Sequence, residues 1–320
     1  MLRTSSLAGG GPSIAQAVFL EDTQPIDVTI YGRRYLQSGY VEDDMSLFDS
    51  SIFTAKALTG GAIEDPKFSA DIILGSVYAN SLFVVVGGDN GVAAKISTSA
   101  DGYVWTARGS TSGTDLLRCA AYGNGYYIAA GNNSKLETST DGISWLARSA
   151  GFGADPIYGV AYGAGLYVAV GANGKIRTSS DLITWTTRAS GFSTSPIFDV
   201  TYDNSLFVAA GASGKIATSS DGLTWNQQTS IFGTSPINSV TYGNGLFIAV
   251  GSLISTSEDG LNWVLSTSPA LQAHHTTSSS DSVVISAGNG GELVSFNSGN
   301  YAGSTVAYAE NNENQYVRIS

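Results

Sequence analysis

The chain has 320 residues, of which 42% are hydrophobic and 13% are charged, and its formal net charge is −11. This apolar content can fill a large core, which excludes a disordered protein, and the negative charge excludes nucleic acid as an expected partner because phosphates would be repelled. No stretch is long and apolar enough to span a membrane as a helix, so we expect no membrane insertion.

The first 60 residues differ from the rest of the chain. Residues 1–25 are small, polar and glycine-rich, and we expect a flexible or partner-ordered arm. Their short apolar run, Ala15–Leu20, is followed at once by two acids and is not read as a signal peptide. Residues 26–60 hold strand-like runs and the cluster Glu42-Asp43-Asp44, which we interpret as a solvated turn and not a metal site. We expect residues 26–60 to act as an attachment or linker segment.

Residues 61–320 are dominated by a repeat of about forty residues. The five tryptophans of the chain lie 40, 40, 40 and 38 residues apart, and tyrosines and glycines recur with them. The repeated positions are Trp105, Trp145, Trp185, Trp225 and Trp263; Tyr78, Tyr122, Tyr162, Tyr202 and Tyr242; and Gly87, Gly131, Gly171, Gly211 and Gly251.

One repeat unit predicts four short strands. Residues 157–162 alternate in polarity, 166–170 are apolar throughout as in a strand buried on both faces, and 175–179 and 184–188 complete the set. Glycine-rich turns separate the strands, and most copies carry Asp-Gly before the fourth, a strong hairpin signal. Four strands per repeat are typical of one blade of a β-propeller.

The fold class is therefore all-β, a propeller of four-stranded blades with a small N-terminal extension. Isolated blades would leave two apolar faces in water, so they must stack, and the repeated tryptophan is expected to fill the space between neighbours. Five copies begin at Ile73, Leu117, Ile157, Ile197 and Ile237, and a worn sixth begins at Leu271. Six blades are favoured. Seven remain an alternative, because residues 28–39 loosely echo two further strands, and residues 316–319 look like an edge strand that could close the ring.

The turn before each tryptophan resembles the Asp-box hairpin of sialidases and other propellers. The best copy is Ser219-Ser-Asp221-Gly-Leu-Thr-Trp225, with one residue fewer than usual between aspartate and glycine. The resemblance implies a structural hairpin, and an aspartate beside a tight turn can accept hydrogen bonds from turn amides. Because catalysis needs one site and five copies are present, we expect a scaffold role.

No catalytic constellation stands out, so we predict that the protein is not an enzyme and needs no cofactor. A sialidase-like site needs an arginine cluster, a tyrosine with a glutamate partner and an acid. The arginines of the blades are instead spread over repeat positions, with glutamates only at Glu137 and Glu258. Cys119, the single cysteine, is expected to be a buried thiol. We expect no catalytic or metal site from the histidines with a nearby acid or from the Asp-Asn-Gly insertion, which we interpret as a plain turn. The candidate residues are Arg108, Arg148, Arg177 and Arg188; His274, His275 and Asp281; and Asp89-Asn90-Gly91.

No binding residue is assigned from the sequence, but one end of the ring is a candidate. The turns between second and third strands and the long connections between blades should lie at the same end. Recurring phenylalanines in these connections should pack inward, and Lys95, Lys135, Lys175 and Lys215, which lie near the turns, are expected to be solubilising, with a basic ring on one face as the alternative. The Ser, Thr, Asn and Gly of the connections suit a carbohydrate or protein ligand.

Three further resemblances bear on function. The repeat Tyr242–Gly251 with its Thr-Ser-x-Asp-Gly-x-x-Trp hairpin is similar to propeller repeats of tailed-phage virion proteins and bacterial surface proteins, over about residues 71–300. Residues 32–39 and 42–48 resemble the linker that precedes such repeats in phage tail proteins, although Phe48-Asp49 stands where that family carries Tyr-Pro. The repeats also resemble the propeller of the photosystem II assembly factor, without that family's arginine patch.

The phage resemblance implies a virion protein of the tail or tail fibre, made in the host cytoplasm and present in several copies. Residues 1–60 would attach it to other virion proteins, and the propeller, residues 61–320, would be displayed to bind a host-surface glycan or protein. A glycan-active, sialidase-like enzyme and a cellular assembly scaffold remain the alternatives.

Overall fold

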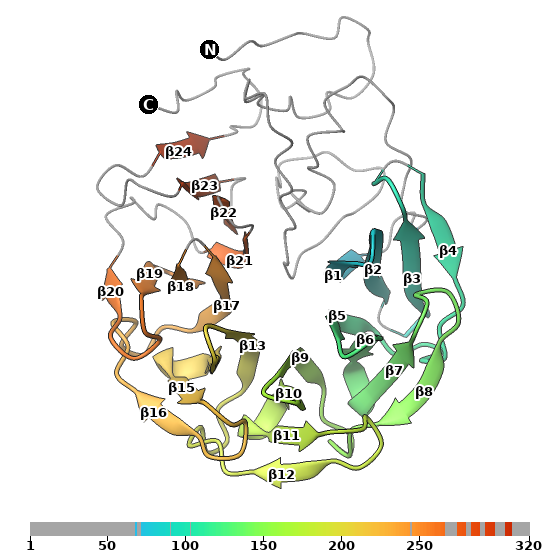
Figure 1. The fold of residues 1–320 in the computed structure, drawn as a ribbon, viewed down its shortest axis with the longest axis horizontal. Coiled ribbons are helices and arrows are strands. Elements are labelled where there is room, and N and C mark those ends of the chain that lie inside the picture. Colours follow the sequence, from blue (N-terminus) through green and yellow to red (C-terminus); the bar gives the residue numbers. More distant parts are fainter. Residues whose placement is uncertain are drawn as a thin grey trace, which may run out of the picture.

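The computed structural model describes Phe68 and residues 72–265, apart from residues 90, 103 and 244, together with the backbone of four further strands between residues 274 and 308. These residues form six four-stranded antiparallel sheets, in which the strands follow one another in chain order. The sheets are arranged around a common middle as the blades of a propeller (Figure 1). The all-β propeller predicted from the repeats is confirmed.

The bounds of the strands follow the repeat closely. The first sheet contains β1 (Ile72–Ala79), β2 (Leu82–Asp89), β3 (Ala93–Ser99) and β4 (Thr106–Arg108). The second contains β5 (Leu117–Gly123), β6 (Tyr126–Gly131), β7 (Lys135–Ser139) and β8 (Leu146–Ser149). The third contains β9 (Ile157–Gly163), β10 (Leu166–Gly171), β11 (Ile176–Ser179) and β12 (Thr186–Arg188).

The remaining sheets repeat the pattern. The fourth contains β13 (Ile197–Asp203), β14 (Leu206–Gly211), β15 (Ile216–Ser219) and β16 (Asn226–Gln228). The fifth contains β17 (Ile237–Gly243), β18 (Leu246–Gly251), β19 (Ile254–Ser257) and β20 (Val264–Leu265), and the sixth β21 (His274–Ser279), β22 (Val283–Gly288), β23 (Glu292–Asn297) and β24 (Thr305–Tyr308). Short 3-10 turns, η3 (Asn132–Ser134), η4 (Ala172–Gly174) and η5 (Ala212–Gly214), join the second and third strands of three blades.

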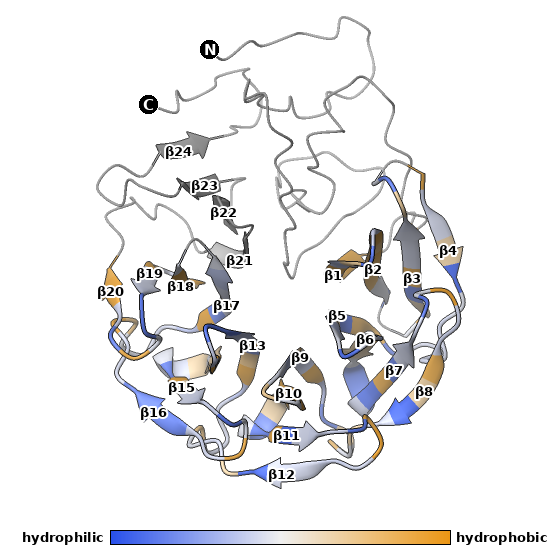
Figure 2. Ribbon diagram, viewed as in Figure 1, coloured by the Kyte–Doolittle hydropathy of each residue, from blue (hydrophilic) through white to orange (hydrophobic). Residues whose placement is uncertain are grey.

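Polarity decides the place of each strand in its blade. The first strand of each blade lies nearest the middle of the ring, and the fourth lies outside (Figure 1). The second strands are apolar at almost every position and, as in β10, are buried at all positions but the first, because neighbouring blades cover both of their faces. Bluer, more polar residues mark outer strands such as β12 and β16 (Figure 2).

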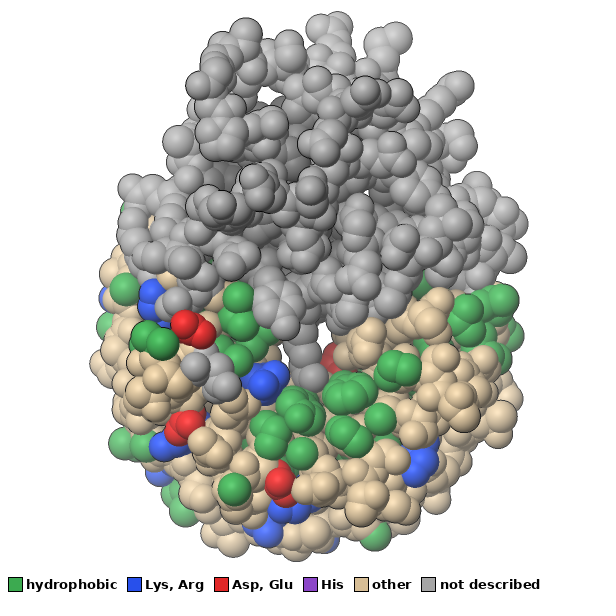
Figure 3. All heavy atoms as spheres, turned by 180° about the vertical axis from the view of Figure 1, so that it is seen from behind, with side chains coloured by type: hydrophobic (Ala, Val, Ile, Leu, Met, Phe, Trp, Pro, Cys, Tyr) green, Lys and Arg blue, Asp and Glu red, His purple; other side chains and the backbone are tan. Residues whose placement is uncertain are grey.

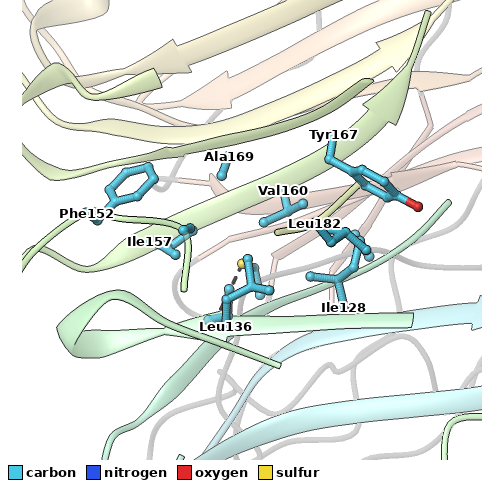
Figure 4. Packing of buried hydrophobic residues seen from close by; sticks show 12 residues of the cluster. Ile128, Leu136, Phe152, Ile157, Val160, Tyr167, Ala169 and Leu182 are labelled. Carbon is cyan, nitrogen blue, oxygen red and sulfur yellow. Dashed lines mark hydrogen bonds between the residues drawn. The ribbon is translucent and has the colours of Figure 1, made fainter. Parts of the chain in front are cut away.

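The core consists of clusters that each join two consecutive blades. Figure 4 shows one of them, in which Ile128 and Leu136 of the second blade meet Ile157, Val160 and Tyr167 of the third. The repeated tryptophans have the predicted place: Trp225, for example, packs in a cluster with residues of the third and fourth blades. The recurring phenylalanines of the connections also pack inward as predicted, being almost fully buried at Phe152, Phe192 and Phe232.

A tyrosine hydroxyl ties two pairs of blades together. The Tyr167 hydroxyl donates to the carbonyl oxygen of Gly123 at the end of the preceding blade's inner strand, at 2.9 Å, and Tyr127 does the same to Ala79 at 2.6 Å. Burial of its hydroxyl raises the pKa of Tyr167 to about 12. In the fourth and fifth blades Phe207 and Phe247 occupy the same position, so the ring alone is enough for packing there.

We predict that the protein loses stability in alkali through Tyr167. Below pH 10 the phenol is protonated in both states and its contribution is complete. Between pH 10 and about 12 the unfolded chain ionises and the folded one does not, so the free energy of unfolding falls by about 2–3 kcal/mol. Urea unfolding from pH 8 to 12 should show this fall, and Tyr167→Phe should reduce it. An equal fall in the variant would contradict the assignment.

Several sequence predictions lie outside the described residues: the arm at 1–25, the attachment segment at 26–60 with Glu42-Asp43-Asp44, and the possible seventh-blade strands at 28–39. The number of blades in the whole chain therefore stays a prediction. The described strands do assign the fourth strand of the sixth sheet to Thr305–Tyr308. Residues 316–319, which looked like an edge strand, also lie outside the described part.

Candidate functional site

The turns and the inter-blade connections meet at one end of the ring, as the sequence predicted. The connection that enters the third blade is typical: Ala172 N donates to Pro156 O within the blade, at 3.1 Å, and Ser134 N of the preceding blade's turn donates to Asp155 O at 3.0 Å. Each such connection thus bridges the turns of two consecutive blades. We call this end of the ring the connection face.

The recurring lysines have a structural role that the sequence analysis did not assign to them. The ammonium groups of Lys95, Lys175 and Lys215 donate to the carbonyl oxygens of Phe68, Phe152 and Phe192 at 2.8–2.9 Å, so they hold the connections against the blades. Two lysines also pair with acids, Lys175 with Asp155 at 2.6 Å and Lys135 with Asp115 at 3.4 Å. Their charges are therefore engaged locally and do not form a free basic ring.

A β-bulge interrupts the start of the inner strands on the connection face. In β5, Leu117 pairs with Gly131 and Cys119 with Ala130, which leaves Arg118 as the extra residue. The same shift recurs in β1, β9, β13, β17 and β21. Bulges re-aim side chains and are common beside functional sites. We call the described bulge residues the inner rim; they are Leu74, Arg118, Tyr158, Phe198 and Asn238.

Three inner-rim side chains from consecutive blades contact one another. The guanidinium carbon of Arg118 lies 5.5 Å from the centre of the Tyr158 ring, and the Tyr158 and Phe198 ring centres are 5.9 Å apart with a tilt of 58°. All three side chains are half-buried, so each keeps part of its surface in solvent. Arg118 Nε also donates to the amide oxygen of Asn132 in η3, at 2.5 Å, which places it on the connection face.

A carboxylate lies one residue beyond the rim. One oxygen of Asp199 accepts hydrogen bonds from Ser239 Oγ at 2.8 Å and from Val240 N at 3.1 Å, both on the neighbouring inner strand β17. Its other oxygen accepts from Val200 N at 2.9 Å. The inner ends of these blades therefore present a cation, two aromatic rings and an amide, with the Asp199 carboxylate bonded to the buried Ser239 hydroxyl next to them.

The inner rim differs from blade to blade where the scaffold repeats. In the first five copies the residue before the rim is aliphatic and a tyrosine recurs near the other end of the strand, but the rim position holds five different side chains. Because the fold can be built with any of them, packing does not explain the variety. Figure 3 shows hydrophobic side chains gathered toward the middle of one face of the molecule.

The inner rim was not predicted from the sequence. The signal was present as the one inner-strand position that varies among nearly identical copies, but its exposure depends on the bulge, and a bulge cannot be read from alternation alone. In the sixth blade His275 has the same place in the backbone register, between His274, which pairs with Gly288, and Thr276, which pairs with Ala287. Asp281 lies outside the described residues.

The other residues considered from the sequence have structural roles. The side chains of Arg108, Arg148 and Arg188 each donate from Nε to a threonine on the adjacent strand, at 2.8, 3.4 and 2.9 Å, and do not converge. Arg177 donates to the Ala150 carbonyl at 3.2 Å. Cys119 is buried as predicted. The insertion near Asp89 forms a turn in which Val92 N donates to Asp89 O at 3.1 Å, although residue 90 itself is not described.

Glu137 proves to be a buried structural residue. Its side chain has no solvent exposure, and its two carboxylate oxygens accept four hydrogen bonds from the connection at residues 110–112. Glu258, the other glutamate considered, is exposed. Neither lies at the inner rim.

The Asp-box-like hairpins are structural, as predicted. In the second blade the Asp141 carboxylate accepts from Ile143 N at 2.8 Å and Ser144 N at 2.9 Å, and Ser139 Oγ donates to it at 2.8 Å. Backbone N–H donors of this kind lower the pKa of the hairpin aspartates, namely Asp141, Asp181, Asp221 and Asp259. The tryptophan of four copies donates to the glycine carbonyl of its own turn, and Trp185, whose turn has Leu182 in place of glycine, does not.

These hairpins predict a loss of stability in acid. A carboxyl with a lowered folded-state pKa contributes fully above its unfolded value of about 4, and the contribution disappears as the pH falls through the folded value. The difference in free energy of unfolding between wild type and Asp221→Asn should therefore be largest near pH 6 and shrink toward pH 2. Urea unfolding at several pH values measures it, and a difference independent of pH would contradict the prediction.

Within the described part of the chain, no three His, Cys, Asp or Glu side chains gather where they could hold a metal ion. The same residues include no helix of the length and hydropathy that a membrane span requires.

Comparisons with known proteins show the fold. No family model and no curated protein matches the chain. Solved structures match as propellers: a streptogramin B lyase at 12% identity and a TM-score of 0.64, covering 76% of this chain and 84% of that one. Virginiamycin B lyase from Staphylococcus aureus matches at 12% identity and a TM-score of 0.61, covering 70% of this chain and 80% of that one. YCF48 bound to a D1 peptide matches at 15% identity and a TM-score of 0.56, covering 72% of this chain and 79% of that one.

The prediction that the chain is not an enzyme is contradicted by these neighbours. Two of them are lyases, so the same architecture supports catalysis in other proteins. The prediction was drawn from the repeated hairpins and the absence of a known constellation, and a propeller can hold its chemistry at one place that the repeat does not reveal. At 12% identity the similarity to these lyases shows the fold of this chain and does not show an activity.

Proposed function

We propose that this chain is a virion protein of a phage tail or tail fibre, whose residues 1–60 attach it to the particle and whose propeller recognises a host-surface molecule at the inner rim. The observation that carries the recognition role is the rim itself. Five different side chains occupy one bulge position on an otherwise repeated scaffold, and Arg118, Tyr158 and Phe198 contact one another with part of their surface in solvent.

The place on a virion is supported by the resemblance of residues 32–39, 42–48 and about 71–300 to phage tail proteins. A propeller as a recognition module is supported by YCF48, which was solved with a bound peptide. A ring of blades fixes its inner strands rigidly, and rigid elements hold a recognition surface with little entropic cost on binding. Binding at such a rim is the first step whether or not a reaction follows.

Immunogold electron microscopy of phage particles from the source, with antibody raised against residues 61–320, tests the proposal. Gold at the tail tip or fibres would support it. Gold on the head or neck would contradict host recognition and indicate a decoration or joining protein. A protein that is present in cells but on no particle would overturn the virion assignment.

A further inference from the structure

Arg118 is held in a fixed orientation at the inner rim. Its Nε donates to Asn132 Oδ1, and the Asn132 backbone N–H is in turn held by Leu116 O at 2.9 Å. The guanidinium carbon lies over the ring of Tyr158, 5.5 Å from the centre of the ring. Two contacts therefore orient one planar group, and the entropy of ordering this side chain is already spent before a ligand binds.

The outer edge of the same guanidinium has no protein partner in the described part of the chain. No described carboxylate forms an ion pair with Arg118, although Lys135 and Lys175 each have one. The Nε atom makes the hydrogen bond to Asn132, and no other hydrogen bond of the side chain is found among the described residues. An oriented guanidinium with its Nη edge unpaired is the geometry that accepts a carboxylate through two parallel hydrogen bonds.

The surroundings of Arg118 limit what can carry that carboxylate. The Tyr158 ring lies beside it and the tilted Phe198 ring lies beside Tyr158. The half-buried Asn238 amide holds the same rim position in the next blade. Flat aromatic surfaces next to polar donors and acceptors suit a ligand with both C–H faces and hydroxyl groups. A peptide anchored by side chains needs apolar pockets, whereas these rings form a surface. The net charge of −11 disfavours a densely charged polyanion.

We propose that the inner rim binds a carboxylate-bearing saccharide, such as a uronic or sialic acid unit, with Arg118 on the carboxylate and Tyr158 and Phe198 against the sugar. The proposal rests on the proposed function, since it names the class of host-surface molecule that the rim recognises. Arg118 contributes a single positive charge to the inner rim, and this charge is balanced by one carboxylate on each bound saccharide unit.

Calorimetric titration of the purified full chain tests the proposal, with acidic oligosaccharides and their carboxyl-reduced counterparts as probes. Wild type should bind an acidic probe at least tenfold more tightly than the reduced one. Arg118→Gln should weaken acidic binding about tenfold or more and leave the reduced probe unaffected, with Arg118→Lys in between because it keeps the charge but not the fork. Arg148→Gln, on an outer strand, is the matched control and should bind as wild type.

Three results would overturn the inference: no acidic saccharide binds, the reduced probes bind as well as the acidic ones, or Arg118→Gln binds like wild type. Tight binding of a peptide through its C-terminal carboxylate, with no saccharide binding, would assign the rim to proteins instead and overturn the saccharide ligand. Circular dichroism and urea unfolding show that each variant is folded. Gold on the tail together with any of these failures would leave the proposed function standing, so the two are distinguishable.

Discussion

Replacing Glu137 with alanine is expected to lower the free energy of unfolding by about 3–5 kcal/mol. The carboxylate is fully buried and accepts hydrogen bonds from Ser110 Oγ at 2.6 Å, Ser112 Oγ at 2.8 Å, Thr111 N at 2.8 Å and Thr111 Oγ1 at 2.9 Å. Alanine would leave the buried Ser112 hydroxyl and the three partly buried donors of Ser110 and Thr111 without this acceptor, and it would open a cavity under the connection. Glu258→Ala removes an exposed glutamate and should change stability by less than about 0.5 kcal/mol.

The other blades show why Glu137 is needed at this one. Connections that enter the third, fourth and fifth blades bury a phenylalanine, but the connection before the second blade has Ser112 in that place. In the fourth blade, Phe192 stands beside Ala217, the residue equivalent to Glu137, and both are fully buried. One connection is thus fixed by a hydrogen-bonded carboxylate where its relatives use an aromatic ring.

A double variant tests whether a buried aromatic ring can replace the hydrogen-bonded carboxylate in fixing this connection. Ser112→Phe with Glu137→Ala copies the Phe192 and Ala217 pair, and it should recover about 1–3 kcal/mol of what Glu137→Ala loses, since a buried aromatic ring replaces the lost bonds. Urea unfolding of both variants and of wild type measures the recovery. A double variant no more stable than the single one would show that the two connections are not equivalent.

The repeat made the blade predictable from sequence. The period of the tryptophans, the apolar second strand and the Asp-Gly hairpins each follow from local residue types, and each has the predicted place, as Trp225 between two blades illustrates. The structural roles of Lys175 and Glu137 were harder to predict from the sequence, because a charged side chain in a strand or turn is not part of an apolar pattern. Their roles come from a connection more than twenty residues earlier, whose carbonyl and hydroxyl groups they bind.

The inner rim was hidden for a different reason. Arg118 follows Leu117 in a strand that alternates, and alternation alone assigns it to one of two faces without showing that a bulge breaks the register there. The bulge repeats in every described inner strand, so its cause lies in the scaffold. The side chain it presents is free to differ, and comparison of the copies with one another reveals this better than the reading of any single copy.

Gly171→Ala is expected to lower the free energy of unfolding by about 3 kcal/mol. Its φ of −175° is extended backbone, which alanine adopts without strain, so space decides the effect. A Cβ there would lie 2.2 Å from the carbonyl oxygen of Pro156, which cannot move freely because Ala172 N donates to it at 3.1 Å. Gly131, Gly211 and Gly251 meet a carbonyl in the same way, at 2.0–2.2 Å, which explains why glycine ends this strand in copy after copy.

The matched control is Gly109→Ala, because a Cβ at Gly109 meets no described atom within 4 Å. Gly109→Ala should change the free energy of unfolding, measured by urea unfolding, by no more than an ordinary surface substitution does, about 0.5 kcal/mol. If Gly171→Ala were equally mild, the connection could shift without cost, and the connection face would be more compliant than its hydrogen bonds indicate. The expected large loss would instead mean that the turns and connections around Arg118 form a stiff frame, as an oriented guanidinium at the inner rim requires.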